Sequence, residues 1–503
     1  MKKVILLLAI LCVFVSGCTA RYEQKESVDS GTPAAVIDAT QEDVKFSNVL
    51  NRSSSYEEVK KHIPFHEIPD FPHTEKIWHQ KLPVDYSERY PYLIPITQKE
   101  SIVYYLLNHR IVGDGYNIWP ENQDNKIYNT VIAFDLKTNT TQWIYPNEYI
   151  LFHSIDASEN FVFTGTNVTD KAIGQDMNYL IAIDIATGKE AWTFNLKQNV
   201  PQEILQAKGE LSSLSIKGGI KYWNQQVFCI VDVYVSSMEK DEEGRYKHFD
   251  YYYLLSLNEK DGSVNWYHMF PQGIHFDYSY MIQMHNDILY ISSGDSHGAS
   301  KELLYTVDLN KKQVKDSYNL PISDLAFLSD EVFFLSPDRK NLTGLIDVET
   351  GNVPWTIGLF PMQKNVYLSF NQMHVWEDLI ILHNDSAMCG IDTKKQDIQF
   401  VYGFEFDGLI ENQESYMMHS FVQSDSMLYI GIGPQDYDQG VTYLVAFDIS
   451  TQQFIWKWKI PETPVTEPNH YEGSIYLTMA PNLVDGSLFF ITNRGKMYEI
   501  PVE

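Results

Sequence analysis

The sequence predicts an all-β protein built as one large β-propeller of eight four-stranded blades. Three observations predict this fold. Residues that favour strands are abundant, with 33 Tyr and 26 Phe among 503 residues. No stretch longer than a few turns repeats its apolar residues at helical spacing. A strand–turn–strand pattern recurs seven times, at intervals close to the length of a propeller blade.

The repeat is clearest in LIAIDIATGKEAW, which runs from Leu180 to Trp192. Apolar residues lead to Asp184, a Thr-Gly turn follows, and the Trp lies eight residues after the Asp. Six relatives keep the eight-residue spacing and change other positions. The seven anchor residues are Asp135, Asp184, Asn258, Asp308, Asp347, Asp392 and Asp448. Five copies end in Trp, one in Phe and one in Asp, and chance does not explain this agreement.

Each copy is predicted to supply two strands of one blade. Another short apolar run stands upstream of every copy, for example at 160–165 and 288–294, and a weaker run before it supplies a fourth strand. Successive anchors are 49, 74, 50, 39, 45 and 56 residues apart. These spacings fit four-stranded blades of about 40 to 50 residues, with insertions where the spacing is largest.

The eighth blade is predicted to combine both ends of the chain. Residues 486–500 supply inner strands, but no Trp-containing strand follows them before Glu503. The missing strand is expected in KIWHQKL at 76–82, which has no Asp strand ahead of it. An N-terminal strand that completes the C-terminal blade would close the ring and remove an open sheet edge. We therefore expect the propeller to span residues 74–503.

The repeated Asp and Trp are predicted to be structural. An Asp side chain can accept hydrogen bonds from the backbone of its own turn. A Trp can pack between neighbouring blades. A residue that recurs in most blades cannot mark a single active site, so the repeat predicts the shape of the molecule and leaves its function to other residues.

The first residues have the features of an export signal. Two lysines precede an apolar run at 4–15, which is too short for a membrane-spanning helix of about 20 residues. Small residues stand directly before Cys18, so residues 1–17 resemble a bacterial lipoprotein signal peptide. The resemblance implies that Cys18 carries lipid and anchors an extracytoplasmic protein through that lipid alone. Because Thr19 follows the cysteine, it implies the periplasmic face of the outer membrane in a cell that has one. The alternative is an ordinary signal peptide with a chance cysteine.

Residues 18–73 are predicted to be a flexible, lipid-anchored tether. Residues 19–45 are polar and contain few large apolar groups. One or two helical turns are expected at 56–61, after three serines. The two prolines of IPDFPH then end any regular element before the propeller begins.

Charge and cysteine content narrow the possible partners. The chain has 38 basic and 66 acidic residues, a net charge of −28. A surface with this much negative charge repels phosphate backbones and anionic lipid. We therefore expect neither nucleic-acid binding nor an electrostatic membrane contact. Cys229 and Cys389 follow the signal region as two widely separated cysteines. This separation favours buried thiols, although a disulfide between them stays open. They lack the spacing of a metal site.

The pattern A-[apolar]-D-x-x-T-G-x-x-x-W resembles the PQQ-type, quinoprotein-like β-propeller repeat family, over roughly residues 74–503. The copy at 180–192 fits the pattern best. With the lipoprotein signal, the overall plan is similar to the BamB-like lipoproteins of the outer-membrane β-barrel assembly machine. As a quinoprotein dehydrogenase, the chain would hold pyrroloquinoline quinone and calcium, with a catalytic Asp and a stacking Trp. As a BamB-like lipoprotein, it would bind protein and carry no cofactor.

The residues favour a BamB-like, protein-binding lipoprotein without a cofactor over a quinoprotein dehydrogenase. The chain has no adjacent cysteines of the kind that many quinoproteins place over the quinone, and no carboxylate cluster at calcium-loop spacing. It also lacks the GxSxG, HExxH, P-loop and GxGxxG motifs. Its histidines are scattered and are expected to be solvated or packed. We therefore expect a monomeric binding protein without catalysis, metal or cofactor.

Binding is expected in the loops that do not repeat. In propellers of this family, the loop between the second and third strands of a blade lies on one face, together with the links between blades. Here these loops are long at 108–126, 167–178 and 236–250, and moderate at 434–440. Tyr and Trp among polar residues are common interface anchors, although loops also vary simply because they tolerate length. The candidate partner-binding residues are Tyr116, Trp119, Tyr246 and Tyr437.

The sequence thus predicts a lipid-anchored propeller that acts as a protein-binding scaffold in the bacterial cell envelope, for example in outer-membrane protein assembly. Three alternatives stay open. They are a lipoprotein that sequesters a secreted toxin or enzyme, a glycan-binding module, and a PQQ-dependent dehydrogenase.

Overall fold

The structure is a computed structural model, which describes most of the chain from Phe65 onward and four short segments before it. The described residues are 41–42, 45–46, 49–50, 60–61, 65–81, 91–109, 129–138, 140–147, 151–166, 168–170, 175–206, 209–240, 244, 246–272, 274–276, 282–293, 303–320, 322–336, 342–358, 372–383, 387–403, 416–434, 442–461, 482–484, 486–492 and 496–502.

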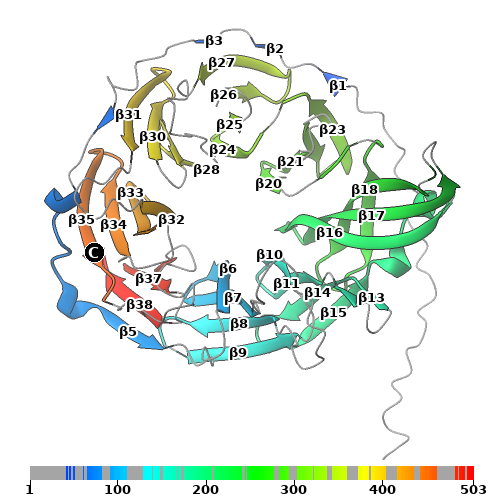
Figure 1. Cartoon of the computed structure of the whole chain (residues 1–503), viewed down its shortest axis with the longest axis horizontal. Helices are drawn as coiled ribbons and strands as arrows, with labels where there is room; N and C mark the ends of the chain where they lie inside the picture. The colour runs from blue at the N-terminus through cyan, green and yellow to red at the C-terminus, as the bar shows by residue number, and fades with distance from the viewer. Residues whose placement is uncertain are drawn as a thin grey trace, which may run out of the picture.

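The protein is all β and forms a ring of eight four-stranded antiparallel blades, as predicted (Figure 1). Blades 1 to 7 follow chain order, and the first strand of each lies toward the centre of the ring. Blade 1 is β6 (Pro91–Lys99), β7 (Ile102–His109), β8 (Asn129–Asp135) and β9 (Thr140–Asn147). Blade 2 is β10 (Leu151–Ala157), β11 (Phe161–Thr166), β14 (Tyr179–Asp184) and β15 (Glu190–Asn195). Blade 3 is β16 (Glu210–Trp223), β17 (Gln226–Lys240), β18 (Tyr246–Asn258) and β19 (Val264–Met269).

The remaining blades repeat the same order. Blade 4 is β20 (Ile282–His285), β21 (Ile288–Ser292), β22 (Leu304–Asp308) and β23 (Gln313–Tyr318). Blade 5 is β24 (Asp324–Leu328), β25 (Glu331–Ser336), β26 (Leu342–Asp347) and β27 (Asn352–Gly358). Blade 6 is β28 (Gln372–Trp376), β29 (Leu379–His383), β30 (Ala387–Asp392) and β31 (Asp397–Gly403). Blade 7 is β32 (Tyr416–Ser424), β33 (Met427–Pro434), β34 (Tyr443–Asp448) and β35 (Gln453–Lys459).

The hydrophobic core lies between neighbouring blades. The third strand of a blade is covered on both sides, so β14 is buried continuously from Leu180 to Ile183. The outer strand β15 is covered on one side only and alternates, with Trp192 and Phe194 buried. Those two aromatic side chains belong to one cluster with Ile216 and Val227 of blade 3. Each blade is therefore held by the next, and the ring behaves as one unit.

Blade 8 contains strands from both ends of the described chain. It consists of β36 (Asn482–Val484), β37 (Ser487–Ile491), β38 (Lys496–Pro501) and β5 (Trp78–Lys81). β5 pairs antiparallel with β38, with Trp78 opposite Glu499 and Lys81 opposite Lys496. The N-terminal segment thus occupies the outer position that the repeat leaves empty in this blade.

The described residues of 41–81 form what we call the N-terminal belt, which follows the outer edges of blades 4 to 8 (Figure 1). Four two-residue strands add in parallel to outer strands: β1 to β23, β2 and β3 to β27, and β4 to β31. Their bounds are β1 Gln41–Glu42, β2 Lys45–Phe46, β3 Val49–Leu50 and β4 Lys60–Lys61. They satisfy backbone groups at edges that would otherwise stay open.

One part of the predicted tether is different in the structure. Lys60 and Lys61 are a strand where a helical turn was expected, because extended backbone pairs with Val401 and Tyr402 of β31. The rest of that expected turn, at 56–59, lies outside the described residues.

Lys457 fixes the belt to blade 7. Its Nζ donates to the carbonyl oxygens of Phe65 at 2.9 Å, His66 at 3.3 Å and Ile68 at 2.7 Å. These carbonyls surround η1 (Phe65–Glu67), and the Phe65 ring lies 5.1 Å from the same ammonium group. Phe65 and Ile68 are buried between blades 6 and 7. The belt therefore adds side chains to the core as well as strands to the edges.

The insertion predicted between Asp184 and Asn258 is confirmed. Part of it lengthens three strands of blade 3, because β16, β17 and β18 have 14, 15 and 13 residues. The rest is a short connection with η3 (Lys197–Asn199) and α3 (Gln202–Leu205). No helix of the described residues is long and apolar enough to cross a membrane.

Candidate interaction surface

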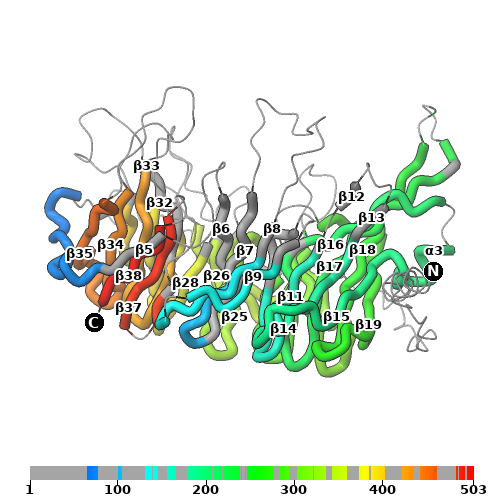
Figure 2. The backbone as a smooth tube through the Cα atoms, turned by 90° about the horizontal axis from the view of Figure 1, so that it is seen from below, coloured from blue at the N-terminus to red at the C-terminus, as the bar shows by residue number. Residues whose placement is uncertain are grey.

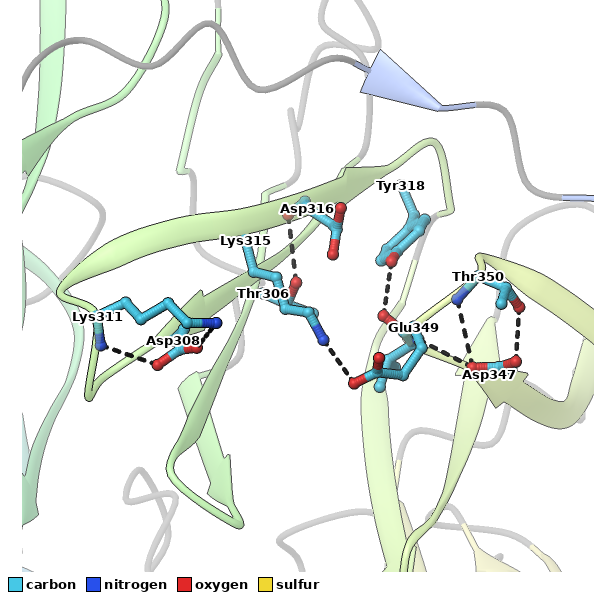
Figure 3. Close-up of polar contacts among 10 residues, drawn as sticks. Thr306, Asp308, Lys311, Lys315, Asp316, Tyr318, Asp347, Glu349 and Thr350 are labelled. Atoms are coloured by element: carbon cyan, nitrogen blue, oxygen red, sulfur yellow. Dashed lines mark hydrogen bonds and ion pairs between the residues drawn. The ribbon is translucent and has the colours of Figure 1, made fainter.

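The anchor residues of the repeat hold the turns between third and fourth strands, as predicted. Asp184 Oδ1 accepts hydrogen bonds from the backbone N–H of Thr187 at 2.8 Å and from its hydroxyl at 2.7 Å. Asp347 accepts from Glu349 and Thr350 in the same way (Figure 3). The other five anchors each accept at least one N–H from their own turn. The bond from the Thr350 hydroxyl is the main reason that the pKa of Asp347 is lowered.

The terminal Trp of one repeat packs on the turn glycine of the next. Trp192 Nε1 donates to the Glu259 carbonyl oxygen at 2.8 Å. A Cβ on Gly262 would lie 2.6 Å from the Trp192 ring, and Gly262 has a φ of +68°. Trp143 has the same relation to Gly188. The Gly and the Trp of the motif therefore act in two different interfaces, and the predicted packing of Trp between blades is confirmed at these positions.

In blade 4 the eight-residue spacing does not find the packing residue. It ends at Asp316, whereas the aromatic side chain that reaches the next blade is Tyr318. The Tyr318 hydroxyl donates to the Val348 carbonyl oxygen at 2.7 Å (Figure 3). A Cβ on Gly351 would lie 2.7 Å from the Tyr318 ring. In blade 6 the Tyr402 hydroxyl makes a similar bond to the Gln452 carbonyl oxygen of blade 7 at 2.7 Å, so this contact does not require a Gly in the turn.

The cysteine question is resolved by the structure. Cys229 and Cys389 are free, fully buried thiols in separate core clusters. Burial raises the pKa of the Cys229 thiol to about 12, so it stays protonated at neutral pH. Both residues act as small apolar core side chains.

Two carboxylates on first strands of the blades are bound by neighbouring blades. Asp324 of β24 accepts the Met373 N–H of blade 6 at 2.7 Å and the Gln283 side-chain amide of blade 4 at 2.7 Å. Asp156 of β10 accepts the Tyr222 N–H of blade 3 at 2.8 Å. These two carboxylates thus join their own blades to neighbouring ones. Over the described residues, no three His, Cys, Asp or Glu side chains could together hold a metal ion.

Of the residues predicted to bind a partner, Tyr246 is described, and it is 54% exposed at the start of β18. Tyr116, Trp119 and Tyr437 lie outside the described residues, as does the lipidation candidate Cys18. The loop at 167–178 contains a small hairpin of β12 (Val168–Asp170) and β13 (Gln175–Met177). The segment at 236–250 is mostly strand, because β17 and β18 continue through it.

We call Val235–Lys240 and Tyr246–Asp250 the blade-3 projection. The two strands extend beyond the body of the ring on one side, in green in Figure 2. Lower on the same strands, Val227 to Val231 are fully buried, whereas Tyr246 to His248 are exposed. The projection is thus a rigid continuation of a core sheet with its end in solvent.

The two faces of the extended sheet differ. On one face Val231, Val233 and Val235 are buried in a cluster with Leu196 and Ile204, so the inserted connection covers this face. The other face begins at the tip with Tyr246, whose ring lies 4.9 Å from the Lys240 ammonium group. The pairing of β17 and β18 places further aromatic and charged side chains, described below, on the same face as Tyr246.

Aromatic rings stack along this second face. The rings of Tyr234 and His248 are 4.9 Å apart with an interplanar angle of 18°. Ser236 Oγ lies 3.3 Å from His248 Nδ1. Toward blade 4, the Tyr252 ring meets His275 edge to face at 6.1 Å. Rings held in this way lose little further entropy when a partner contacts them.

One ion pair and one histidine–carboxylate contact follow the rings at the base of the projection. Lys217 Nζ lies 3.5 Å from Asp232 Oδ2, and His275 Nδ1 lies 3.9 Å from Asp250 Oδ2. Burial raises the pKa of Asp232, Lys217 lowers it, and the negative charge of Asp250 raises it further. The surface therefore carries charges of both signs between aromatic side chains, an arrangement that suits a protein interface.

Comparisons with known proteins add little. No protein-family model matches the chain, and no curated protein matches it. A quinohemoprotein alcohol dehydrogenase from Comamonas testosteroni is similar in structure, with a TM-score of 0.44 and 12% identity over 82% of this chain and 71% of that one. The WD40 domain of SCAP from fission yeast has a TM-score of 0.39 and 10% identity over 85% of this chain and 98% of its own.

Proposed function

We propose that this propeller is a non-catalytic scaffold that binds another protein through the blade-3 projection. The observation that carries the proposal is the projection itself, a stiff two-stranded extension of the core with Tyr246 exposed at its end. Its rings and charges are held by neighbouring side chains before any partner arrives. Preorganised aromatic anchors with a charged surround are characteristic of binding surfaces.

The finer proposal is that the scaffold works in the bacterial cell envelope, attached by lipid at Cys18, and takes part in outer-membrane protein assembly as BamB-like lipoproteins do. The sequence at 1–18 and the PQQ-type repeat support it. The belt also supports it, because the N-terminal segment reaches the ring along its outer edge and leaves the projection uncovered in the described residues.

The binding proposal is tested by shortening the projection at a defined register. Val235 and Phe249 are opposite each other, so a two-residue Asn-Gly turn can join them in place of 236–248. The shortened protein, Tyr246→Ala and the wild type are used to capture partners from detergent-solubilised envelopes. We expect capture to be lost on shortening and weakened by Tyr246→Ala.

The matched control is Ile144→Ala on β9 of blade 1, a comparably exposed apolar side chain at 48% exposure. It should capture as the wild type does. Capture that survives shortening of the projection contradicts the binding proposal. Recovery of envelope proteins other than barrel-assembly components contradicts the finer assignment only.

Lipid attachment is tested separately. Cys18→Ala should move the protein from the membrane fraction to the soluble fraction, while Cys12→Ala should not. Membrane association of the Cys18 variant would remove the lipid anchor from the proposal and leave the binding surface unaffected.

A further inference from the structure

The outer edge of β18 is paired along only half of its length. β19 lies opposite Tyr253 to Leu257. Phe270 continues the ladder by one bond, from its N–H to the Tyr252 carbonyl oxygen at 2.9 Å. Above this point β18 continues from Tyr251 to Tyr246 with β17 on its inner side and no strand of the described residues on its outer side.

The direction of the free backbone groups follows from the ladder. In an antiparallel sheet, alternate residues direct both N–H and C=O to the same neighbouring strand. Tyr252 points its carbonyl outward to Phe270, so Asp250, His248 and Tyr246 also point outward. No backbone partner for these three residues occurs among the described residues. Among the described residues, this edge therefore has backbone donors and acceptors without a paired strand, and His275 lies beside Asp250 at its base.

The protein already completes other outer edges by strand addition. Two-residue strands of its own belt add to β23, β27 and β31, in blades 4, 5 and 6. The upper edge of β18 is longer than any of these additions, contains no proline and is rich in Tyr and Phe, which favour strands. Natural proteins usually protect such an edge or use it.

We propose that the outer edge of β18 from Tyr246 to Asp250 docks an extended strand of the partner, which continues the ladder that β19 begins. This proposal rests on the proposed function and specifies how the partner is held. Backbone hydrogen bonds provide affinity, and alternate side chains of the added strand contact either Tyr246 and His248 or Phe249. Those cross-strand neighbours favour aromatic or β-branched residues in the partner strand.

The occupant is a strand of another protein and not a second copy of this chain. A net charge of −28 on each copy opposes the approach of two projections. A neutral or basic strand meets no such barrier. The partner class is thus an extended, uncapped segment of a β-rich protein that is neutral or basic and alternates aromatic or β-branched residues with polar ones.

The test separates backbone pairing from side-chain contact. The probe is a fluorescein-labelled ten-residue peptide that alternates Tyr or Val with Lys or Thr, and binding is measured by anisotropy. His248→Pro removes one outward N–H and keeps the inward ladder to β17, whereas His248→Ala removes the side chain and keeps the backbone. We expect His248→Pro to weaken binding about tenfold or more, and His248→Ala, which loses a side-chain contact but keeps the backbone donor, to weaken it clearly less.

A second measurement does not depend on how the proline variant folds. The same peptide with an N-methyl group on every backbone amide keeps its side chains and loses the donors of both edges, so it should not bind the wild type. Equal effects of the two His248 variants, or unchanged binding of the methylated peptide, would overturn strand addition. Wild-type dimerisation that His248→Pro abolishes would assign the edge to a second copy and overturn the proposal too.

The outcomes also distinguish this proposal from the proposed function. If shortening the projection abolishes partner capture from envelopes while both His248 variants capture normally, the scaffold proposal stands and strand addition is wrong. If capture survives shortening, both are wrong.

Discussion

Gly262→Ala perturbs one contact between blades at a known atom. Gly262 lies in the turn between β18 and β19 with a φ of +68°, and an added Cβ would lie 2.6 Å from Cε3 of Trp192. The left-handed backbone costs an L-residue about 1–2 kcal/mol. Forcing a methyl group against a packed ring costs about 1–3 kcal/mol more. We expect the free energy of unfolding to fall by about 3 kcal/mol, measured by guanidinium denaturation.

Gly244→Ala is the matched control. Gly244 has a φ of +81°, and no atom of the described residues lies within 4 Å of its added Cβ. It should lose only the backbone part, about 1–2 kcal/mol. In a Trp192→Ala background, the cost of Gly262→Ala should fall to that same value, because the two residues are coupled. Equal losses for the two glycines in the wild type would refute the packing argument.

Four further predictions concern buried polar groups; the first three are measured from the free energy of unfolding and the fourth by proteolysis. Tyr253→Phe should be neutral or stabilise by about 1 kcal/mol, because its buried hydroxyl has no partner among the described residues. Tyr318→Phe should destabilise by about 1–2 kcal/mol, because it loses the bond to blade 5. Burial raises the pKa of Asp324 from 3.8 to about 6, so the protonated carboxyl stabilises the folded state fully below pH ~4, and this stabilisation is lost as the pH rises through about 6. Asp324→Asn should therefore remove a pH dependence of up to about 3 kcal/mol in the free energy of unfolding across that range. Lys457→Met should release the belt and speed proteolysis within residues 65–71, because three carbonyl oxygens lose a charged donor.

Each of these has an outcome that contradicts it. Equal effects of Phe at 253 and 318 would mean that the Tyr253 hydroxyl is satisfied. A stability curve that keeps its slope between pH 4 and 7 in Asp324→Asn would place the titration elsewhere. Lys459→Met is the control for Lys457, since Lys459 is exposed two residues along the same strand. Similar proteolysis of the two lysine variants would remove Lys457 from the belt contact.

The ring could be predicted because its turns repeat a chemical requirement. An Asp that caps the turn and a residue with left-handed φ four positions after it recur, whichever amino acids occupy the other positions. Lys312, Gln396 and Gln452 take this position with φ of 57°, 54° and 54°, where blades 2, 3 and 5 have Gly. A search for Gly therefore misses these turns, whereas a search for the anchor and its spacing finds them.

The belt could not be predicted, because its strands carry no pattern. Gln41–Glu42 and Lys60–Lys61 are strands of two residues, which are too short to show an alternation of apolar and polar residues. The projection was predicted as a loop at 236–250 because it is polar. It is strand because nothing in YVSSMEK breaks the extended backbone and β18 offers a long partner. The aromatic at Tyr318 was missed because the packing geometry tolerates a shift of two positions along the strand.

The pairing of β5 with β38 also has a consequence for how the molecule folds. Blades 1 to 7 each join residues that are near in sequence and can form one after another as the chain is made. The pairing of β5 with β38, which forms the seam between the two ends of the chain, must instead close a loop of roughly 400 residues. Its free-energy cost in chain entropy is about 2 kcal/mol larger than that of a loop of one blade's length. The belt contact at Lys457 joins residues 392 apart and lies beside the same seam. The last event in folding and the first in unfolding should therefore occur at blade 8, so native-state hydrogen exchange should be faster at β5 and β38 than in the other seven blades.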